Sequence, residues 1–301
     1  MHDTVINWLI EEDNPAVRYR TLTELCGRPA AEAEDSYASV WQQKSIVKML
    51  QKQDENGLWS SKDWGGHTPL RYLTAFAEHG VKQDKRLDRF VDHTVGILQS
   101  AADEGDLAGC AGPLTLRALV MMGYGGREDV MALISAFSAA QLRDGGFICK
   151  RLLDKKPLRK SCFKAAFAGL LLYAECSRKG ILPGGAEELV GYFLKRNVFY
   201  YQGLSLKDGR PGWRFTDNFF PVEPMRMGLP LIAAALAVLG AGEHPAMGET
   251  WALLKEKQDE NGKYHLEGTL VKQPCSFGKV GQSNKWVTFY ALLAQKNGAK
   301  I

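Results

Sequence analysis

The chain has 301 residues, 45% of them hydrophobic, and a formal net charge of +4 at pH 7. That length allows one large domain or two ordinary ones, and the apolar fraction is enough to fill a sizeable core. A charge so close to balance does not indicate a nucleic-acid partner. The six cysteines include no CxxC pair, which is typical of free thiols in a reducing cytoplasm, where we expect the protein to reside.

Targeting and membrane signals are not predicted. Acidic residues occur within a helical pattern in the first dozen residues, without the basic start and apolar run of a signal peptide. The longest apolar run, residues 229–241, is shorter than the about 20 residues that span a bilayer. We therefore predict a buried helix there and no transmembrane segment.

Two short helices are predicted at the N-terminus. The first closes at residues 8–10, and Asn14 is expected to cap the second, with Pro15 at its first position. This pair resembles a single HEAT-like unit. We assign it to residues 1–28, packed on a larger domain of residues 29–301.

Beyond Pro29 the sequence alternates between two kinds of predicted helix. The first kind is amphipathic, with apolar residues three and four apart, and comprises residues 37–53, 87–100, 128–142, 186–196 and 246–257. The second kind is rich in Ala, Gly, Thr and Leu and poor in charge, and comprises residues 67–77, 113–122, 162–174, 225–239 and 286–294. Strict alternation of five such pairs predicts an all-α double ring with the apolar helices inside.

A short motif, Gln-x-x-(Asn or Asp)-Gly-x-aromatic, recurs between these helices. Its three copies are residues 53–59, 141–147 and 258–264. The glycine is expected to take the left-handed turn that ends a helix, and the glutamine to bond carbonyls left open there. The aromatic residue is expected to cover the joint. An open HEAT-like solenoid is the alternative fold, favoured by residues 13–25 and by helix pairs of similar length.

The three motif copies resemble those of the α/α toroid superfamily of terpenoid cyclases and protein prenyltransferase β subunits, whose repeats carry a Gln…Gly-Trp-type motif. The resemblance covers residues 37–296. It implies a toroid of inner and outer helices, a deep apolar cavity, functional residues at the inner-helix ends near its mouth, and an isoprenoid-like ligand.

The catalytic motifs of that superfamily are incomplete. Residues 103–106, Asp-Glu-Gly-Asp, lack the third-position acid of the cyclase Asp-x-Asp-Asp motif. The prenyltransferase Asp-x-Cys zinc motif retains only its cysteine in Lys160-Ser161-Cys162, and residues 284–286 lack the zinc-binding histidine. The resemblance therefore implies the fold and the ligand class, and neither reaction.

A zinc site is one candidate. His67, Cys110 and Cys162 lie at predicted inner-helix starts and Cys149 follows the second motif copy, so these four soft ligands are expected to converge. The alternative is that the cysteines are small buried hydrophobes and that His67 is a local helix-end residue.

A ligand-binding mouth is the second candidate. Lys160, Arg226 and Lys285 at inner-helix starts would attract an anionic head group, although a solvated loop is the alternative for the basic run before Cys162. Aromatic side chains expected to line the cavity and stabilise a cation are Trp64, Tyr72 and Trp286. Most such aromatics are instead core packing.

Acid–base chemistry is the third candidate. Asp106 or Glu223 beside an apolar cavity would have a raised pKa and could donate a proton, while the alternatives are helix caps or lysine partners. Cys162 is a further candidate catalytic residue. Two function hypotheses remain open: an enzyme acting on a hydrophobic, isoprenoid-like small molecule with a polar head, cyclase-, isomerase- or transferase-like; or a non-catalytic lipid- or peptide-binding protein. Neither involves nucleic acid, and the sequence does not predict the oligomeric state.

Overall fold

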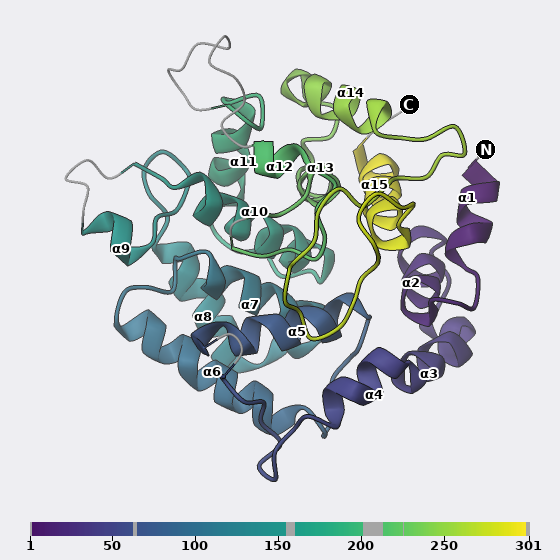
Figure 1. Cartoon of the computed structure of the whole chain (residues 1–301). Helices are drawn as coiled ribbons and strands as arrows, with labels where there is room; N and C mark the ends of the chain where they lie inside the picture. The colour runs from purple at the N-terminus through teal and green to yellow at the C-terminus, as the bar shows by residue number, and fades with distance from the viewer. Residues whose placement is uncertain (1, 63–64, 155–159, 201–212, 225, 299–301) are drawn as a thin grey trace.

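The computed structural model describes residues 2–62, 65–154, 160–200, 213–224 and 226–298 (Figure 1). Within these ranges every regular element is a helix, and the only strand-like pairings are isolated bridges such as Phe219 with Gly268. The predicted all-α class is confirmed. No helix in the described ranges is long and apolar enough to cross a bilayer.

Five helices are buried almost all round. They are α5 (Thr68–Glu78), α7 (Ala111–Met121), α10 (Phe163–Arg178), α13 (Leu229–Val238) and α15 (Lys285–Gly298). Along the chain each packs on the next, α5 on α7, α7 on α10, α10 on α13 and α13 on α15 (Figure 1). Each overlaps one predicted apolar segment, so the low charge of these segments correctly indicated burial.

A second set of helices keeps one face exposed. It comprises α3 (Glu34–Gln42), α4 (Lys44–Leu50), α6 (Asp88–Asp103), α8 (Glu128–Ala139), α11 (Ala186–Leu194) and α14 (Gly248–Glu256). These overlap the predicted amphipathic segments, with one difference: residues 37–53 form two helices, because the backbone is extended at Gln43 (φ −57°, ψ 132°). Two further short α-helices are α9 (Lys150–Leu153) and α12 (Trp213–Thr216).

Glycine allows close packing between the two sets at α10. A Cβ atom on Gly169 would lie 2.9 Å from the ring of Phe137 on α8 and 3.0 Å from that of Phe147. Those two rings stack with centroids 4.1 Å apart. Phe147 is the aromatic residue of the second motif copy, so it covers the joint between an exposed helix and a buried one, as predicted.

The motif glycines take the predicted left-handed turn, with φ of 74° at Gly57, 88° at Gly145 and 79° at Gly262. In each copy the glutamine amide donates to the carbonyl of that same glycine, at 2.9, 2.8 and 3.2 Å. The glutamine therefore closes its own loop, which differs from the predicted bond to the end of the preceding helix.

Two of the motif glutamines also reach the next repeat. Gln53 Nε2 donates to the Arg86 carbonyl at 3.0 Å, just before α6, and Gln141 Nε2 donates to the Gly185 carbonyl at 2.8 Å, just before α11. A primary amide has two donor hydrogens, which suits one bond within the loop and one outside it. The motif thus joins consecutive helix pairs.

The N-terminal helices are α1 (His2–Leu9) and α2 (Pro15–Arg20), followed by the π-helix η1 (Thr21–Leu25). Asn14 Oδ1 accepts from the Val17 N–H at 3.2 Å and Pro15 is the first residue of α2, so the predicted cap is confirmed. Both α2 and η1 contact α15. The first helices of the chain therefore lie beside the last one.

Candidate functional site

Three of the predicted metal-ligating cysteines come together at the beginnings of α7 and α10. Cys110 is the residue before α7 and Cys162 the residue before α10, and these two helices pack on each other. The thiol of Cys110 is hydrogen-bonded to that of Cys162, and Cys149 is close enough to Cys110 to influence its ionisation. All three side chains are half-buried.

The second motif copy holds Cys162 in place. Asp144 accepts hydrogen bonds from the Ser161 hydroxyl and, at 3.3 Å, from the Ser161 N–H. The Cys162 N–H donates to the Phe147 carbonyl at 2.7 Å. A Cβ atom on Gly146 would lie 2.5 Å from the Ser161 side chain, so the close approach of the two segments requires glycine there.

The two hydrogen-bonded thiols have opposite tendencies to ionise. The hydrogen bond from Cys110 lowers the pKa of Cys162 to about 5, helped by the backbone N–H groups of Ala165 and Lys164 in the first turn of α10 and by the charge of Lys164, while burial opposes the shift. The pKa of Cys110 is raised, because its proton is used in that hydrogen bond and because it is buried. A thiolate at a helix N-terminus with a neutral thiol beside it is the arrangement of a reactive cysteine.

Asp106 has a structural role beside this group. Its Oδ1 accepts from the Lys150 N–H at 3.1 Å, next to Cys149, and its carbonyl accepts from the Gly109 N–H at 3.1 Å, next to Cys110. Asp106 therefore fixes the two loops that carry these cysteines, which is the helix-end role that the sequence left open as the alternative to a catalytic acid.

The predicted four-ligand metal site is not formed. Among the described residues no group of three or more His, Cys, Asp and Glu side chains is arranged to hold a metal ion. His67 lies exposed in the short 3₁₀ helix η3 (Gly65–His67). The three cysteines of the predicted set lie close together, but they are not arranged as ligands of a shared metal ion.

Two of the three cations that were predicted to form an anion-binding mouth instead form ion pairs with acidic side chains of the protein. Lys285 is buried against Glu11, at 2.9 Å, and Asp13, both from the N-terminal segment. Arg226 pairs with Asp217. Lys160 is exposed.

The other predicted ligand-binding or catalytic side chains also have protein partners. Glu223 lies 3.6 Å from Arg71, so its partner is an arginine rather than the lysine that the sequence left open as an alternative to a catalytic acid. Tyr72 stacks on Trp59 with ring centroids 4.5 Å apart, and Trp286 is buried and stacks on Phe220 at 5.5 Å. These two aromatic residues are core packing. Trp64 lies outside the described residues.

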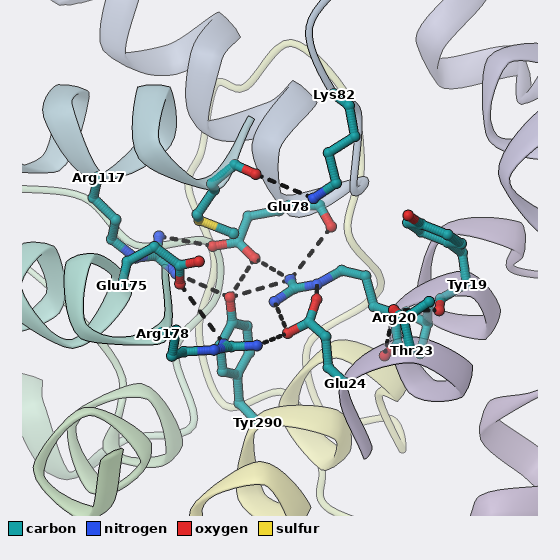
Figure 2. A network of polar contacts seen from close by, with 12 residues as sticks. Tyr19, Arg20, Thr23, Glu24, Glu78, Lys82, Arg117, Glu175, Arg178 and Tyr290 are labelled. Atoms are coloured by element: carbon teal, nitrogen blue, oxygen red, sulfur yellow. Dashed lines mark hydrogen bonds and ion pairs between the residues drawn. The ribbon is translucent and has the colours of Figure 1, made fainter. Parts of the chain in front are cut away.

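A group of buried charged side chains lies at the opposite ends of the buried helices and was not predicted from the sequence. We call it the central charge cluster (Figure 2). Its members are Arg20, Glu24, Glu78, Arg117, Glu175, Arg178 and Tyr290. Arg117 is the one charged residue in the apolar sequence of α7. A single charged residue in a helix that is buried all round needs a buried partner of opposite charge. Arg117 was therefore the feature of the sequence from which the cluster could have been predicted.

Glu78, at the last position of α5, is the centre of this cluster and is 0% exposed. Its carboxylate accepts from Arg20 Nη1 at 2.7 Å, from Arg117 Nη1 at 2.9 Å and from the Tyr290 hydroxyl at 2.6 Å. Burial alone would raise the pKa of Glu78, but the two guanidinium groups outweigh it and hold the pKa below its usual value. Glu78 is therefore a carboxylate fixed by its partners.

Glu24 of η1 is held in the same way. Arg20 Nε donates to it at 2.7 Å, and Arg178 at the end of α10 donates to its other oxygen. Burial opposes ionisation here too, and the two arginines still lower the pKa of Glu24 well below its usual value. The cluster contains three arginines and three glutamates and is balanced in charge, which favours a role in holding the helices together.

The chain was compared with known proteins at three levels, and no protein-family model, no curated protein and no solved structure matches it.

Proposed function

We propose that this chain is a thiol–disulfide oxidoreductase on an α/α toroid, with Cys162 as the attacking thiolate and Cys110 as the resolving thiol. The observation that carries the proposal is the meeting of Cys110 and Cys162 at the beginnings of the packed helices α7 and α10, where the thiol of Cys110 lowers the pKa of Cys162. Cys149, at the edge of the same group, is the residue that would rearrange such a disulfide.

The toroid is supported by the order of helix contacts. The five buried helices pack in sequence from α5 to α15, and Tyr290 of α15 donates to Glu78 of α5, the first of the five, at 2.6 Å. An open solenoid would separate its first and last helix pairs. The hydrogen bond between α15 and α5 therefore favours closure.

The proposed reaction balances without a cofactor. The Cys162 thiolate attacks one sulfur of a disulfide RSSR, the S–S bond breaks, and RS⁻ leaves and takes up a proton from water. Cys110 then loses its proton to solvent, its sulfur attacks Cys162 Sγ, and the second RS⁻ leaves. The protein dithiol is oxidised to a Cys110–Cys162 disulfide and RSSR is reduced to two thiols; the reverse sequence reduces the protein.

The hydrophobic-ligand hypothesis has less support. One cavity between the buried helices, lined by residues such as Leu171, Leu231 and Leu293, has a volume of about 20 Å³. A cavity of that size accommodates about one water molecule. This cavity is therefore too small for an isoprenoid-like ligand.

Oxidation by glutathione disulfide tests the proposal. After incubation in glutathione redox buffers, peptide mass spectrometry is expected to show a Cys110–Cys162 disulfide. Cys162→Ser should abolish mixed-disulfide formation at this group, whereas Cys110→Ser should trap glutathione on Cys162. Cys26, which is exposed and lies in the N-terminal segment, is the internal control for unassisted reaction.

The pH dependence of alkylation is the second measurement. Iodoacetamide should modify Cys162 with a half-maximal rate near pH 5, and Cys110→Ala should move that midpoint upward because alanine has no donor to replace the thiol hydrogen bond to the thiolate. A Cys162 no more reactive than Cys26 would contradict the proposal. So would a stoichiometric metal that must be chelated before any thiol reacts.

A further inference from the structure

A second pocket lies at the other ends of the buried helices, beside the central charge cluster. Its volume is about 250 Å³, and it lies between η1, the segment after α5 and the end of α10. This is below the roughly 300–1,000 Å³ of pockets for drug-sized ligands. Its occupant would therefore be small.

The pocket lining is rich in positive charge. It includes the cations Arg20, Lys82, Arg178 and Lys179 and the anions Glu24 and Glu175. Outside the pocket, Glu78 and Arg117 form a further pair of opposite charges at 2.9 Å. The lining therefore has two more positive than negative charges, and the adjoining cluster does not change that excess.

Two lysines account for the excess positive charge of the lining. Lys82 Nζ donates to the Met121 carbonyl at 3.1 Å, and within the described ranges neither Lys82 nor Lys179 forms an ion pair. Burial and, after it, the positive charge of Lys179 lower the pKa of Lys82 to about 8, so the two ammonium groups repel each other. In Figure 2 the Lys82 side chain extends toward Glu78 at the edge of the cluster.

The arginines of the lining have their partners already. Arg20 is bonded to Glu24 and Glu78, and Arg178 to Glu24. The guanidinium forks, which bind a carboxylate or a phosphate through two parallel hydrogen bonds, are therefore already engaged, whereas lysine can bind a phosphate as a point charge. A phosphate group also carries about −1.5 to −2 charges at pH 7, which matches the excess.

We infer that this pocket binds a phosphate group, free or on a small ester, between the ammonium groups of Lys82 and Lys179. The ligand would offset the repulsion between the two lysines and use the remaining donors of Lys82. The site lies at the opposite ends of the helices from the cysteine group, so this inference does not rest on the proposed thiol chemistry.

Calorimetric titration of the full chain tests the inference. Inorganic phosphate and glycerol phosphate are the two probes, and their relative affinities separate free phosphate from an ester. Sulfate tests charge and shape, and succinate tests a carboxylate. We expect saturable binding of one phosphate probe, at least tenfold weaker in Lys82→Met and partly retained in Lys82→Arg.

Matched controls separate binding from folding. Lys44→Met, at an exposed lysine on α4, should bind phosphate as the wild type does, and so should Cys162→Ser. The melting temperature of each variant without phosphate shows whether it folds. If Lys82→Met does not fold, Lys82→Arg and Lys179→Met give the test.

Three results would overturn the inference. They are no saturable binding of either phosphate probe to the wild type, equal affinity in wild type and Lys82→Met, or equal affinity for succinate and phosphate. In the first case the lysines would serve only to stabilise the carboxyl ends of the helices, as the bond from Lys82 to the Met121 carbonyl already does.

Discussion

Glu78 and His79 are adjacent buried residues at the end of α5, and their neighbours keep Glu78 ionised and His79 neutral. Two arginines surround the Glu78 carboxylate and keep it ionised. His79 faces the rings of Phe277 and Trp286, and burial lowers its pKa to about 4. Buried groups therefore take the charge state that their immediate neighbours stabilise.

The neutral state of His79 makes stability depend on pH. Its pKa in the folded chain is below the 6.5 of an ordinary histidine, so the unfolded chain binds the proton first. The stabilising contribution is complete above pH 6.5 and is lost as the pH falls toward 4. We expect the free energy of unfolding to decrease by about 1.4 kcal/mol per pH unit across that window on account of this residue.

Urea denaturation at several pH values measures this slope. His79→Gln should flatten it, because glutamine does not titrate. His93→Gln, at an exposed histidine on α6, is the control and should keep the wild-type slope. A wild-type slope that persists in His79→Gln would show that other groups cause it.

At the scale of elements, the motif loops differ in how much space their glycines leave. Gly145 and Gly57 both have positive φ, 88° and 74°. A Cβ atom on Gly145 would lie 2.2 Å from the carbonyl oxygen of Glu188, whereas on Gly57 its nearest neighbour would be an Arg89 atom at 3.8 Å. The second motif copy therefore packs directly on α11, and the first has room.

Alanine substitution separates backbone strain from packing. Gly57→Ala is expected to cost about 1–2 kcal/mol of unfolding free energy, because it places a side chain in the left-handed region. Gly145→Ala should cost about 1–3 kcal/mol more, since α11 must also move. Chemical denaturation of both variants measures the difference, and equal losses would mean that the Glu188 backbone yields without cost.

The helices were predictable from the sequence because periodicity and charge depletion report burial directly. The break at Gln43 was not, because we find no glycine, proline or capping signal there. Individual contacts were the least predictable. Lys285 stands at the start of the buried helix α15, where the sequence predicts a ligand-binding cation, but it pairs with Glu11 and Asp13. Sequence position locates the residue without identifying its partner.

The cysteine group shows which contacts the repeat pattern predicts and which it does not. Cys110 and Cys162 were expected to converge because both precede predicted inner helices that are consecutive in the repeat, and they do so at the starts of the buried helices α7 and α10. His67 occupies the equivalent place one helix earlier but is exposed and outside the group. The repeat thus predicted which ends lie near one another, and side-chain geometry decided the chemistry.

At the scale of the whole molecule, Arg20 connects the beginning of the chain to its middle and end. Its guanidinium donates to Glu78 on α5, at 2.7 Å, and to the Tyr290 hydroxyl on α15, at 3.2 Å. It is 2% exposed. The N-terminal segment that the sequence indicated as an added helical pair therefore supplies part of the interior.

Replacing Arg20 should be far more costly than replacing its neighbour on the same helix. Arg20→Met leaves Glu78 without one of its cations, and breaking a buried pair costs about 3–5 kcal/mol. Arg18→Met removes a pair with exposed Glu12 and should cost at most about 1 kcal/mol. Thermal and chemical unfolding of both variants measure the contrast.

Similar losses in the two arginine variants would mean that the central charge cluster rearranges around the gap. Arg20→Lys refines this test. Lysine keeps the charge but cannot bond Glu24, Glu78 and Tyr290 together, so it should recover only part of the lost stability.

The contact between Arg20 and Tyr290 also has a consequence for synthesis. The two residues are 270 positions apart, so at about 5–20 residues per second the ribosome makes Tyr290 roughly 15 to 50 s after Arg20. During that interval the N-terminal helices can pair Arg20 with Glu24 but cannot complete its surroundings. Arg20 therefore lacks part of its final set of partners until the last helix, α15, has been made. Chaperone binding to the nascent chain would matter most during that interval.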